Sequence, residues 1–359
     1  MYHAGALMRG VTPEVSVVLP AYNGRKYVRA AVESILTQTF TDFELIVIDD
    51  ASSDGSAHIL AELARGDSRL QVHRHERNMG FRQALNTGCR IARAPIVAKM
   101  SHDDISMPQR LERQVAFLHA HPEVGVVGAS VQLIDADDRP GRIQKYPASP
   151  GLAAWSMLFL NAIAHPVVTM RRSLLNPAEA YPDGCAGGTE DYALFGALSR
   201  HQGVASLDEV LLRYRAWPGS MTSTLSDEQN ADATRIAVVV ARSWGITLEP
   251  GVAVRLRGLP LEQYPIDDTH LRELSALIHD WTDAVLTERR WSSADRSAIR
   301  RAAATRLLHV GALVSTRSPF AGLSQCLSAL VMSPAALLDF SAKAARALRS
   351  KLSSNTARL

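Results

Sequence analysis

The sequence predicts an α/β fold in which a doubly wound, mostly parallel, Rossmann-like sheet is followed by a C-terminal α-helical region. Short β-branched strands alternate with amphipathic helices through the first third of the chain, an order typical of parallel sheets. Acidic or polar clusters follow several of these strands. Beyond residue 230 the strand signals fade and long helical patterns replace them. We therefore expect a leader over 1–13, the α/β domain over 14–230, and the helical region over 231–359.

The first strand is predicted at 15–19, where a β-branched run ends at Pro20. A helix over 26–37 follows, because apolar residues recur there at helical spacing. The same two patterns predict the remaining elements in order: strand 43–48, helix 56–65, strand 70–72, helix 83–91, strand 94–98, strands 125–128 and 131–134 with a turn at 138–141, and helices over 271–285 and 298–314.

Bulk composition excludes several classes of protein. The chain has 359 residues with 39 basic and 36 acidic side chains. Its net charge of +3 is too small to indicate nucleic-acid binding. Its three cysteines form no metal-ligand pattern and suit a reducing compartment. Because no signal-peptide run and no membrane-spanning run of ~18 apolar residues is present, we expect a cytoplasmic protein. The oligomeric state stays open.

The C-terminal tail reads as a basic amphipathic helix. After Pro334, Leu337, Leu348 and Leu352 share one helical face while basic residues lie off it. Such a helix can lie in an anionic membrane surface, which would make the protein peripheral on the inner face of the cell membrane. The alternative is a helix that packs on its own domain or on a partner.

Two adjacent carboxylates, Asp103 and Asp104, follow the apolar strand at 94–98. This places negative charge at the carboxyl edge of the sheet, where ligands of open α/β sheets bind. Paired carboxylates are costly unless they share a cation, and Mg²⁺ or Mn²⁺ takes oxygen ligands of this kind. The alternative is that these acids cap a helix that begins near Met107.

Three further polar clusters are predicted at strand ends: 20–23, Asp49–Asp50, and Glu190–Asp191. They offer an aromatic ring for stacking on a base, a carboxylate for a base N–H or a ribose hydroxyl, and a general base. The last cluster can also cap a helix. Neither a Gly-x-x-x-x-Gly-Lys loop nor a Gly-x-Gly-x-x-Gly loop follows the first strand. The pattern therefore indicates a nucleotide site that binds a diphosphate through a metal.

The sequence resembles the family 2 glycosyltransferases, which have the GT-A fold and transfer a sugar from a nucleotide-sugar with inversion. The resemblance spans about residues 14–222. It is carried by ordered matches at 15–23, 34–40, 43–56, 78–80, 84–88, 107–114, 165–166 and 189–192.

The resemblance implies roles for individual residues. Pro20, Tyr22 and Asp50 would hold the nucleotide base and ribose. Asp191 would be the catalytic base. The implied donor is a UDP- or dTDP-sugar, and the acceptor is a glycan or lipid-linked hydroxyl in polysaccharide biosynthesis at the cell envelope.

The residues expected to contact the diphosphate are chosen partly from the resemblance and partly from their charge. Asp103 and Asp104 match the family's metal and diphosphate motif, so the implied cofactor is Mn²⁺ or Mg²⁺. On charge grounds we add Arg82 and Lys99 as expected diphosphate contacts. For Arg82 the alternative is a solvated helix residue.

Two departures from the family pattern keep rival interpretations open. Ser101 stands where the family usually has an acid, and Trp217 where it often has a histidine. A non-catalytic relative that binds a glycan or partner is one rival. A sugar nucleotidyltransferase is another, although its basic glycine-rich loop is absent.

Several other side chains have two interpretations. His165 either contacts the acceptor or is a packed structural histidine. His102 either interacts with the neighbouring acids or, as we expect, is an exposed loop residue. An apolar stripe either lines an acceptor site or belongs to the core. That stripe consists of Trp155, Met157, Phe159 and Leu160.

Overall fold

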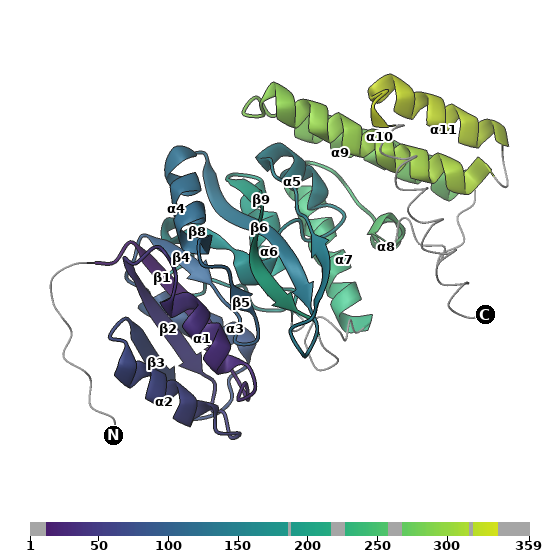
Figure 1. Cartoon of the computed structure of the whole chain (residues 1–359). Coiled ribbons are helices and arrows are strands. Elements are labelled where there is room, and N and C mark those ends of the chain that lie inside the picture. Colours follow the sequence, from purple (N-terminus) through teal and green to yellow (C-terminus); the bar gives the residue numbers. More distant parts are fainter. Residues whose placement is uncertain (1–11, 186–187, 217–226, 258–267, 316–318, 337–359) are drawn as a thin grey trace, which may run out of the picture. The chain divides into compact units, whose positions relative to one another are not determined.

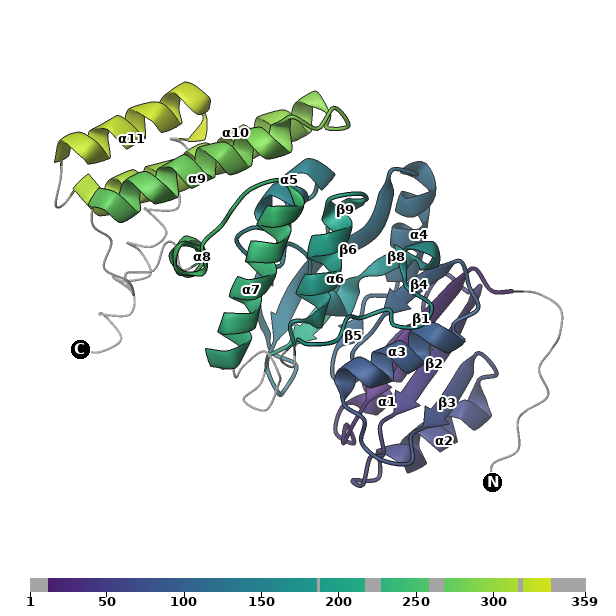
Figure 2. The same ribbon diagram turned by 180° about the vertical axis from the view of Figure 1, so that it is seen from behind.

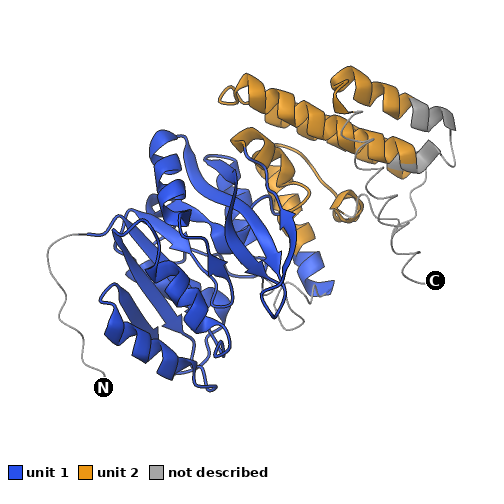
Figure 3. Cartoon of the chain, viewed as in Figure 1, with its two compact units in different colours: residues 1–148, 161–232 blue, residues 149–160, 233–359 orange. Residues whose placement is uncertain are grey.

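The computed structural model describes residues 12–185, 188–216, 227–257, 268–315 and 319–336. The chain forms two compact units (Figure 3). Unit 1 is formed from 1–148 and 161–232, and unit 2 from 149–160 and 233–359. The predicted leader and the predicted domain limits stay predictions.

The first half of unit 1 is a parallel sheet in the order β3-β2-β1-β4 (Figure 1). Every residue of β1 and β2 is buried, because helices cover both faces of these strands. The strands are β1 (Val15–Ala21), β2 (Phe43–Asp49), β3 (Leu70–Arg74) and β4 (Ile96–Lys99). This half has the predicted doubly wound arrangement.

Helices cover opposite faces of these strands, as Figures 1 and 2 show for α1 and α3. On one face, Val17 and Leu19 of β1 join a core with apolar residues of α1, α2 and α4. On the other face, Val18 packs against Gly88 of α3. The helices are α1 (Val28–Leu36), α2 (Ser56–Gly66), α3 (Phe81–Ile91) and α4 (Arg110–Ala120).

The second half of the sheet is mixed. β8 runs antiparallel between β4 and β6, while β9 pairs parallel to β6. The prediction of two strands at 125–128 and 131–134 was wrong, because Ala129 and Ser130 are buried and continue one strand. The elements here are β5 (Ile105–Ser106), β6 (Val124–Ile134), β7 (Pro140–Gln144), η1 (His165–Val167), β8 (Thr169–Arg171), η2 (Arg172–Leu174), α6 (Glu190–Ser199) and β9 (Gly203–Arg215).

Unit 2 is helical in its described part. The Trp155 indole donates to Thr282 Oγ1 (3.0 Å), and the Trp281 indole donates to the Trp155 carbonyl (2.8 Å), so α5 is joined to α9. Its helices are α5 (Pro150–Ser156), most of α7 (Asp227–Ser243), α8 (Pro250–Arg257), α9 (Asp268–Leu286), α10 (Ser293–Ser315) and α11 (Pro319–Met332).

The core interpretation of the apolar stripe holds for three of its four residues. Trp155, Met157 and Phe159 are buried in unit 2, whereas Leu160 is exposed. Within the described ranges, no helix is both long and apolar enough to cross a membrane. The basic tail from Leu337 to Leu352 lies outside the described residues, so both of its interpretations stay predictions.

The close approach of α3 to β1 gives a stability prediction. A Cβ added at Gly88 would lie 2.3 Å from Val18 Cγ1, whereas one added at Gly66 of α2 meets nothing within 4 Å. We expect Gly88→Ala to lower the free energy of unfolding by about 1–3 kcal/mol through overpacking. Gly66→Ala should leave it unchanged or raise it slightly, because alanine is the better helix former. Urea unfolding of the full chain measures both, and equal effects would contradict this packing.

Candidate functional site

The loops after β1 and β2 are tied together at the carboxyl edge of the sheet. Asn23, in the left-handed region with φ 48°, donates its N–H to Ser52 Oγ (3.0 Å) and accepts from the Ser53 N–H (2.9 Å). Asparagine tolerates this conformation better than most residues. Tyr22 is held beside it with its side chain 45% exposed, while Pro20 is buried within β1. The exposed ring is thus open for stacking.

Asp50 lies just beyond β2 and anchors the loop that precedes α3. Its Oδ1 accepts from the Met79 N–H (2.8 Å) and lies 2.6 Å from His75 Nδ1. Its Oδ2 accepts from the Gly80 N–H (2.8 Å), and the residue is only 2% exposed. The carboxylate therefore stabilises the loop before α3, and its contact with a nucleotide stays a prediction.

Asp103 and Asp104 lie in the loop between β4 and β5. The helix-cap interpretation of this pair was wrong, because β5 intervenes and α4 starts at Arg110 with no side-chain cap. Asp104 is fully buried: its Oδ1 accepts from the Arg215 N–H (2.8 Å), but its Oδ2 has no hydrogen-bond partner. Burial and the charge of Asp103 raise the pKa of Asp104 to about 7. Asp103 is half-buried.

Arg215, the last residue of β9, fixes this acid loop, and sequence reasoning did not single it out. Its guanidinium donates to the carbonyls of Asp103 (2.7 Å) and Asp135 (2.9 Å) and to Asp138 Oδ1 (2.6 Å). The guanidinium also stacks 4.1 Å above the Tyr27 ring and is almost fully buried. β9 also contains Asp208, Glu209 and Arg213, so no local sequence pattern distinguished Arg215. It braces the acid loop against the turn after β6.

Lys99, at the end of β4, connects the acid pair with the predicted base. Its buried ammonium donates to Ser101 Oγ (2.5 Å). The carboxylates of Asp104, Asp103 and Asp191 all act on this charge, and burial lowers the pKa of Lys99 to about 8. The structure therefore brings the predicted metal ligands, the predicted base and this lysine into one electrostatic cluster.

Arg82 in α3 was expected either at the diphosphate or in solvent. Its guanidinium instead forms ion pairs with Glu179 (2.7 Å) and Asp183 (2.8 Å), and only 21% of the side chain is exposed. The solvated interpretation was wrong. A diphosphate contact would require Arg82 to exchange these partners, and that role stays a prediction.

Asp191 is the second residue of α6, so the predicted strand-end position of this cluster was wrong. Its Oδ2 accepts from Asn161 Nδ2 (2.7 Å) and its Oδ1 from the Tyr192 N–H (2.7 Å). Burial, and then the neighbouring Glu190, raise the pKa of Asp191 to about 7 against the lowering effect of Lys99. A buried carboxyl that titrates near neutrality suits proton transfer.

Two histidines flank the cluster. His165 lies with Nδ1 3.9 Å from Asp191 Oδ2 and Nε2 3.0 Å from the Tyr181 hydroxyl. His102 is not the exposed loop residue we expected. Its ring lies against Gly24, where an added Cβ would come within 2.4 Å, and it hydrogen-bonds the Pro20 carbonyl.

The metal prediction rests on two carboxylates. Within the described residues, no cluster of three or more His, Cys, Asp and Glu side chains could hold an ion by itself. The unpartnered Asp104 Oδ2 beside Asp103 nevertheless fits a cation that takes its remaining ligands from water and substrate oxygens. Trp217, the other departure from the family pattern, lies outside the described residues.

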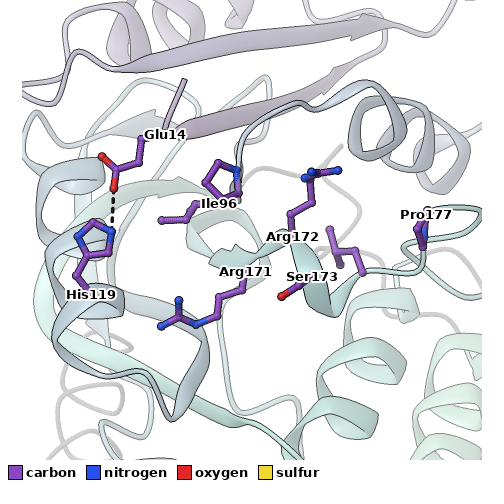
Figure 4. Close-up of a pocket in the computed structure, with 9 residues that line it drawn as sticks. Glu14, Ile96, His119, Arg171, Arg172, Ser173 and Pro177 are labelled. Carbon is purple, nitrogen blue, oxygen red and sulfur yellow. Dashed lines mark ion pairs between the residues drawn. The ribbon is translucent and has the colours of Figure 1, made fainter. Parts of the chain in front are cut away.

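A cavity of about 520 Å³ lies away from this cluster (Figure 4). Pro95 and Ile96 line it at the start of β4, together with Arg172, whose main-chain N–H donates to the Pro95 carbonyl (2.8 Å). Glu14 and His119, which form an ion pair (2.8 Å), also line it. These positions belong to the amino-terminal edge of β1 and β4. The cavity is therefore separate from the ligand-binding carboxyl edge.

Comparisons with known proteins identify the family and agree with the fold. The family model described as Glycosyl transferase family 2 matches residues 16–176. The chain is 30% identical over 207 residues to the O-antigen biosynthesis glycosyltransferase WbnJ of Escherichia coli. That alignment covers 56% of this chain and 79% of WbnJ. It is 29% identical over 204 residues to the amylovoran biosynthesis glycosyltransferase AmsE of Erwinia amylovora, covering 56% and 76%.

Solved structures show the same architecture. The crystal structure of S. aureus TarS 1-349 in complex with UDP-GlcNAc matches with a TM-score of 0.53 at 18% identity, covering 90% of this chain and 91% of that one. At this identity the likeness concerns the fold, which is the expected GT-A fold. The family model and the relatives show that the chain belongs to glycosyl transferase family 2 and is a glycosyltransferase.

Proposed function

We propose that the chain transfers a glycosyl group with inversion from a nucleoside diphosphate sugar to a hydroxyl of a glycan or lipid-linked acceptor, with Asp191 as the general base. One observation carries this proposal. Asp191 is a buried carboxyl whose pKa is raised to about 7, and it shares the Lys99 ammonium with the acid pair. A base that titrates near the working pH is well matched to accept a hydroxyl proton.

The reaction follows from this arrangement. The acceptor oxygen forms a bond to the anomeric carbon while the bond from that carbon to the diphosphate oxygen breaks on the opposite face. The hydroxyl proton passes to Asp191. The negative charge that leaves with the diphosphate needs a counter-charge, and the Lys99 ammonium of the cluster would supply one.

A divalent cation completes the proposed donor site. Asp103 and Asp104 would hold it, because Asp104 Oδ2 is buried without a partner and the two acids repel each other. When bound, such an ion stabilises the negative charge of the leaving diphosphate. Ser101 supplies no ligand charge here, and its hydroxyl holds the Lys99 ammonium.

The remaining roles follow the family pattern. Tyr22, the most exposed aromatic side chain at this edge, would stack on the base, with Pro20 and Asp50 shaping the nucleotide pocket. UDP is the leading donor nucleotide because TarS binds UDP-GlcNAc, and dTDP is the second choice. The O-antigen and amylovoran relatives support an acceptor in cell-envelope polysaccharide synthesis. The cytoplasmic location and membrane contact stay predictions.

Replacing the proposed base tests the reaction directly. We expect Asp191→Asn to lower kcat by ~10²–10⁴ while UDP binding is retained, because the amide cannot take a proton. Release of nucleotide from UDP-, dTDP- and GDP-sugars, with extracted cell-envelope glycan or water as acceptor, measures this. NMR of the anomeric proton in the product shows whether the configuration is inverted relative to the donor. Asp208→Asn, on an exposed carboxylate, is the control, and full turnover by Asp191→Asn would contradict the proposal.

The pH profile tests the same group independently. The ionised carboxylate is the active form, so kcat/KM should rise as the pH increases through about 7, the pKa of Asp191. Glu190→Gln removes a neighbouring negative charge that raises this pKa, so the acidic limb should move to lower pH. A limb near pH 4 in the wild type, or no movement in the variant, would contradict the assignment.

Metal-dependent nucleotide binding tests the acid pair. We expect calorimetry and thermal shift to show that Mn²⁺ strengthens binding of UDP or dTDP to the wild type. The combined Asp103→Ala and Asp104→Ala substitutions should abolish this effect, because the ion loses both proteinaceous ligands. Asp208→Ala is the matched control. Folded wild-type protein that binds no nucleotide with Mn²⁺ present would contradict the donor site.

A further inference from the structure

His165 faces two different polar groups with its two ring nitrogens. Its Nε2 lies 3.0 Å from the Tyr181 hydroxyl oxygen, and its Nδ1 lies 3.9 Å from Asp191 Oδ2. The ring also contacts Phe81 and Phe195, each with a centroid separation of 6.0 Å in an edge-to-face arrangement. The side chain is only 11% exposed. Aromatic packing therefore fixes the plane of the imidazole and hence the direction of both nitrogens.

The position of the imidazole proton follows from the neighbours. Burial and the charge of Lys99 lower the pKa of His165 well below 6.5, so the ring is neutral at pH 7 and carries one proton. Burial raises the pKa of Tyr181 well above 10, so its hydroxyl keeps a proton to donate, and His165 Nε2 lies within hydrogen-bond distance of it. With Nε2 as the acceptor, the ring proton is on Nδ1. That N–H faces Asp191.

Tyr181 is itself held firmly in place. Its main-chain N–H donates to Asn86 Oδ1 (2.8 Å), and its carbonyl accepts from Asn86 Nδ2 (3.1 Å). Asn86 lies in the middle of α3 and is buried. Because both main-chain groups of Tyr181 are bonded to one rigid helix, the hydroxyl is presented to His165 in a fixed position.

We propose that His165 is a positioning residue for Asp191: its Nδ1–H, set by the Tyr181 hydroxyl, directs the carboxylate toward the acceptor hydroxyl. This inference rests on the proposed role of Asp191 as the general base. The 3.9 Å separation is longer than a hydrogen bond, and such contacts commonly shorten when substrate binds. Asn161 Nδ2, 2.7 Å from the same oxygen, is the second donor that orients the carboxylate.

The tautomer can be tested without a substrate. Imidazole ¹⁵N spectra of the full chain are compared with those of His165→Gln, and the signal that disappears belongs to His165. We expect a neutral ring protonated on Nδ1 at pH 7, and a redistribution toward Nε2 protonation in Tyr181→Phe. A ring protonated on Nε2, or a charged ring, in the wild type would overturn the proposal.

Two amide substitutions separate positioning from packing. The amide nitrogen of asparagine reaches the place of Nδ1, whereas that of glutamine reaches the place of Nε2. We expect His165→Gln to lower kcat by about tenfold to a hundredfold, the effect of losing one hydrogen bond to a charged group, with the KM for donor unchanged. His165→Asn should recover activity to within about threefold of wild type. Equal losses in both variants would show a merely structural role.

Controls keep the result interpretable. His119→Asn and His119→Gln alter a histidine in the separate cavity and should behave alike. If both His165 variants fail to fold, Tyr181→Phe replaces them: we expect a lower kcat at constant donor KM, and an unchanged kcat overturns the proposal. Asp191→Asn distinguishes a failure of the proposed function from a failure of the positioning role alone. An active Asp191→Asn defeats the proposed function, whereas an inactive one beside indifferent His165 variants defeats only the positioning role.

Discussion

The burial of one ammonium among three carboxylates is the constraint on which this site depends. Burying a lysine ammonium away from water costs free energy unless negative charge lies close to it. Burying paired carboxylates costs free energy in the same way unless positive charge lies close to them. The charge of Lys99 acts on Asp103, Asp104 and Asp191 together, so it offsets part of both costs. One positive charge among three carboxylates still leaves net negative charge for the proposed cation. The Lys99 charge lowers the pKa of Asp104 and of Asp191, so without it both carboxyls would stay protonated to higher pH. The cluster thereby holds the acid pair and Asp191 in one electrostatic unit.

The mixed sheet makes this cluster possible. β8 pairs antiparallel with β4, which places His165–Val167 directly beside the strand that ends in Lys99. The Lys99 N–H donates to the Val168 carbonyl (2.9 Å), and the buried Arg110 guanidinium donates to the carbonyls of both residues. A fully parallel sheet would not bring the segment that precedes β8 to this position. The antiparallel strand thus connects the parallel half of the sheet with the half that carries Asp191.

Helix α3 links the two ends of the site through separate contacts. The loop before it is bonded to Asp50, its first residue Phe81 contacts both the Lys99 ammonium and the His165 ring, and Asn86 fixes Tyr181. Its close approach to β1 depends on Gly88. The helix therefore positions groups near Asp50 and near Asp191 with one rigid body. Its packing is consequently part of the site and more than a cover for the sheet.

The sequence by itself determined the parallel half of the sheet, because β-branched runs and helical spacing are local signals that tertiary contacts rarely reverse. It also indicated Asp103, Asp104 and Asp191 as candidate site residues, through motifs that are contiguous in the chain, and their roles stay predictions. It could not show that 124–134 form one strand, that β8 runs antiparallel, or that Arg215, Asn161 and Tyr181 brace the site. Those facts depend on partners distant in the chain, such as Arg215 and Asp103, which are 112 positions apart. Only the tertiary structure decides which side chains share a buried volume, and burial is what shifts the pKa of Asp191 toward neutrality.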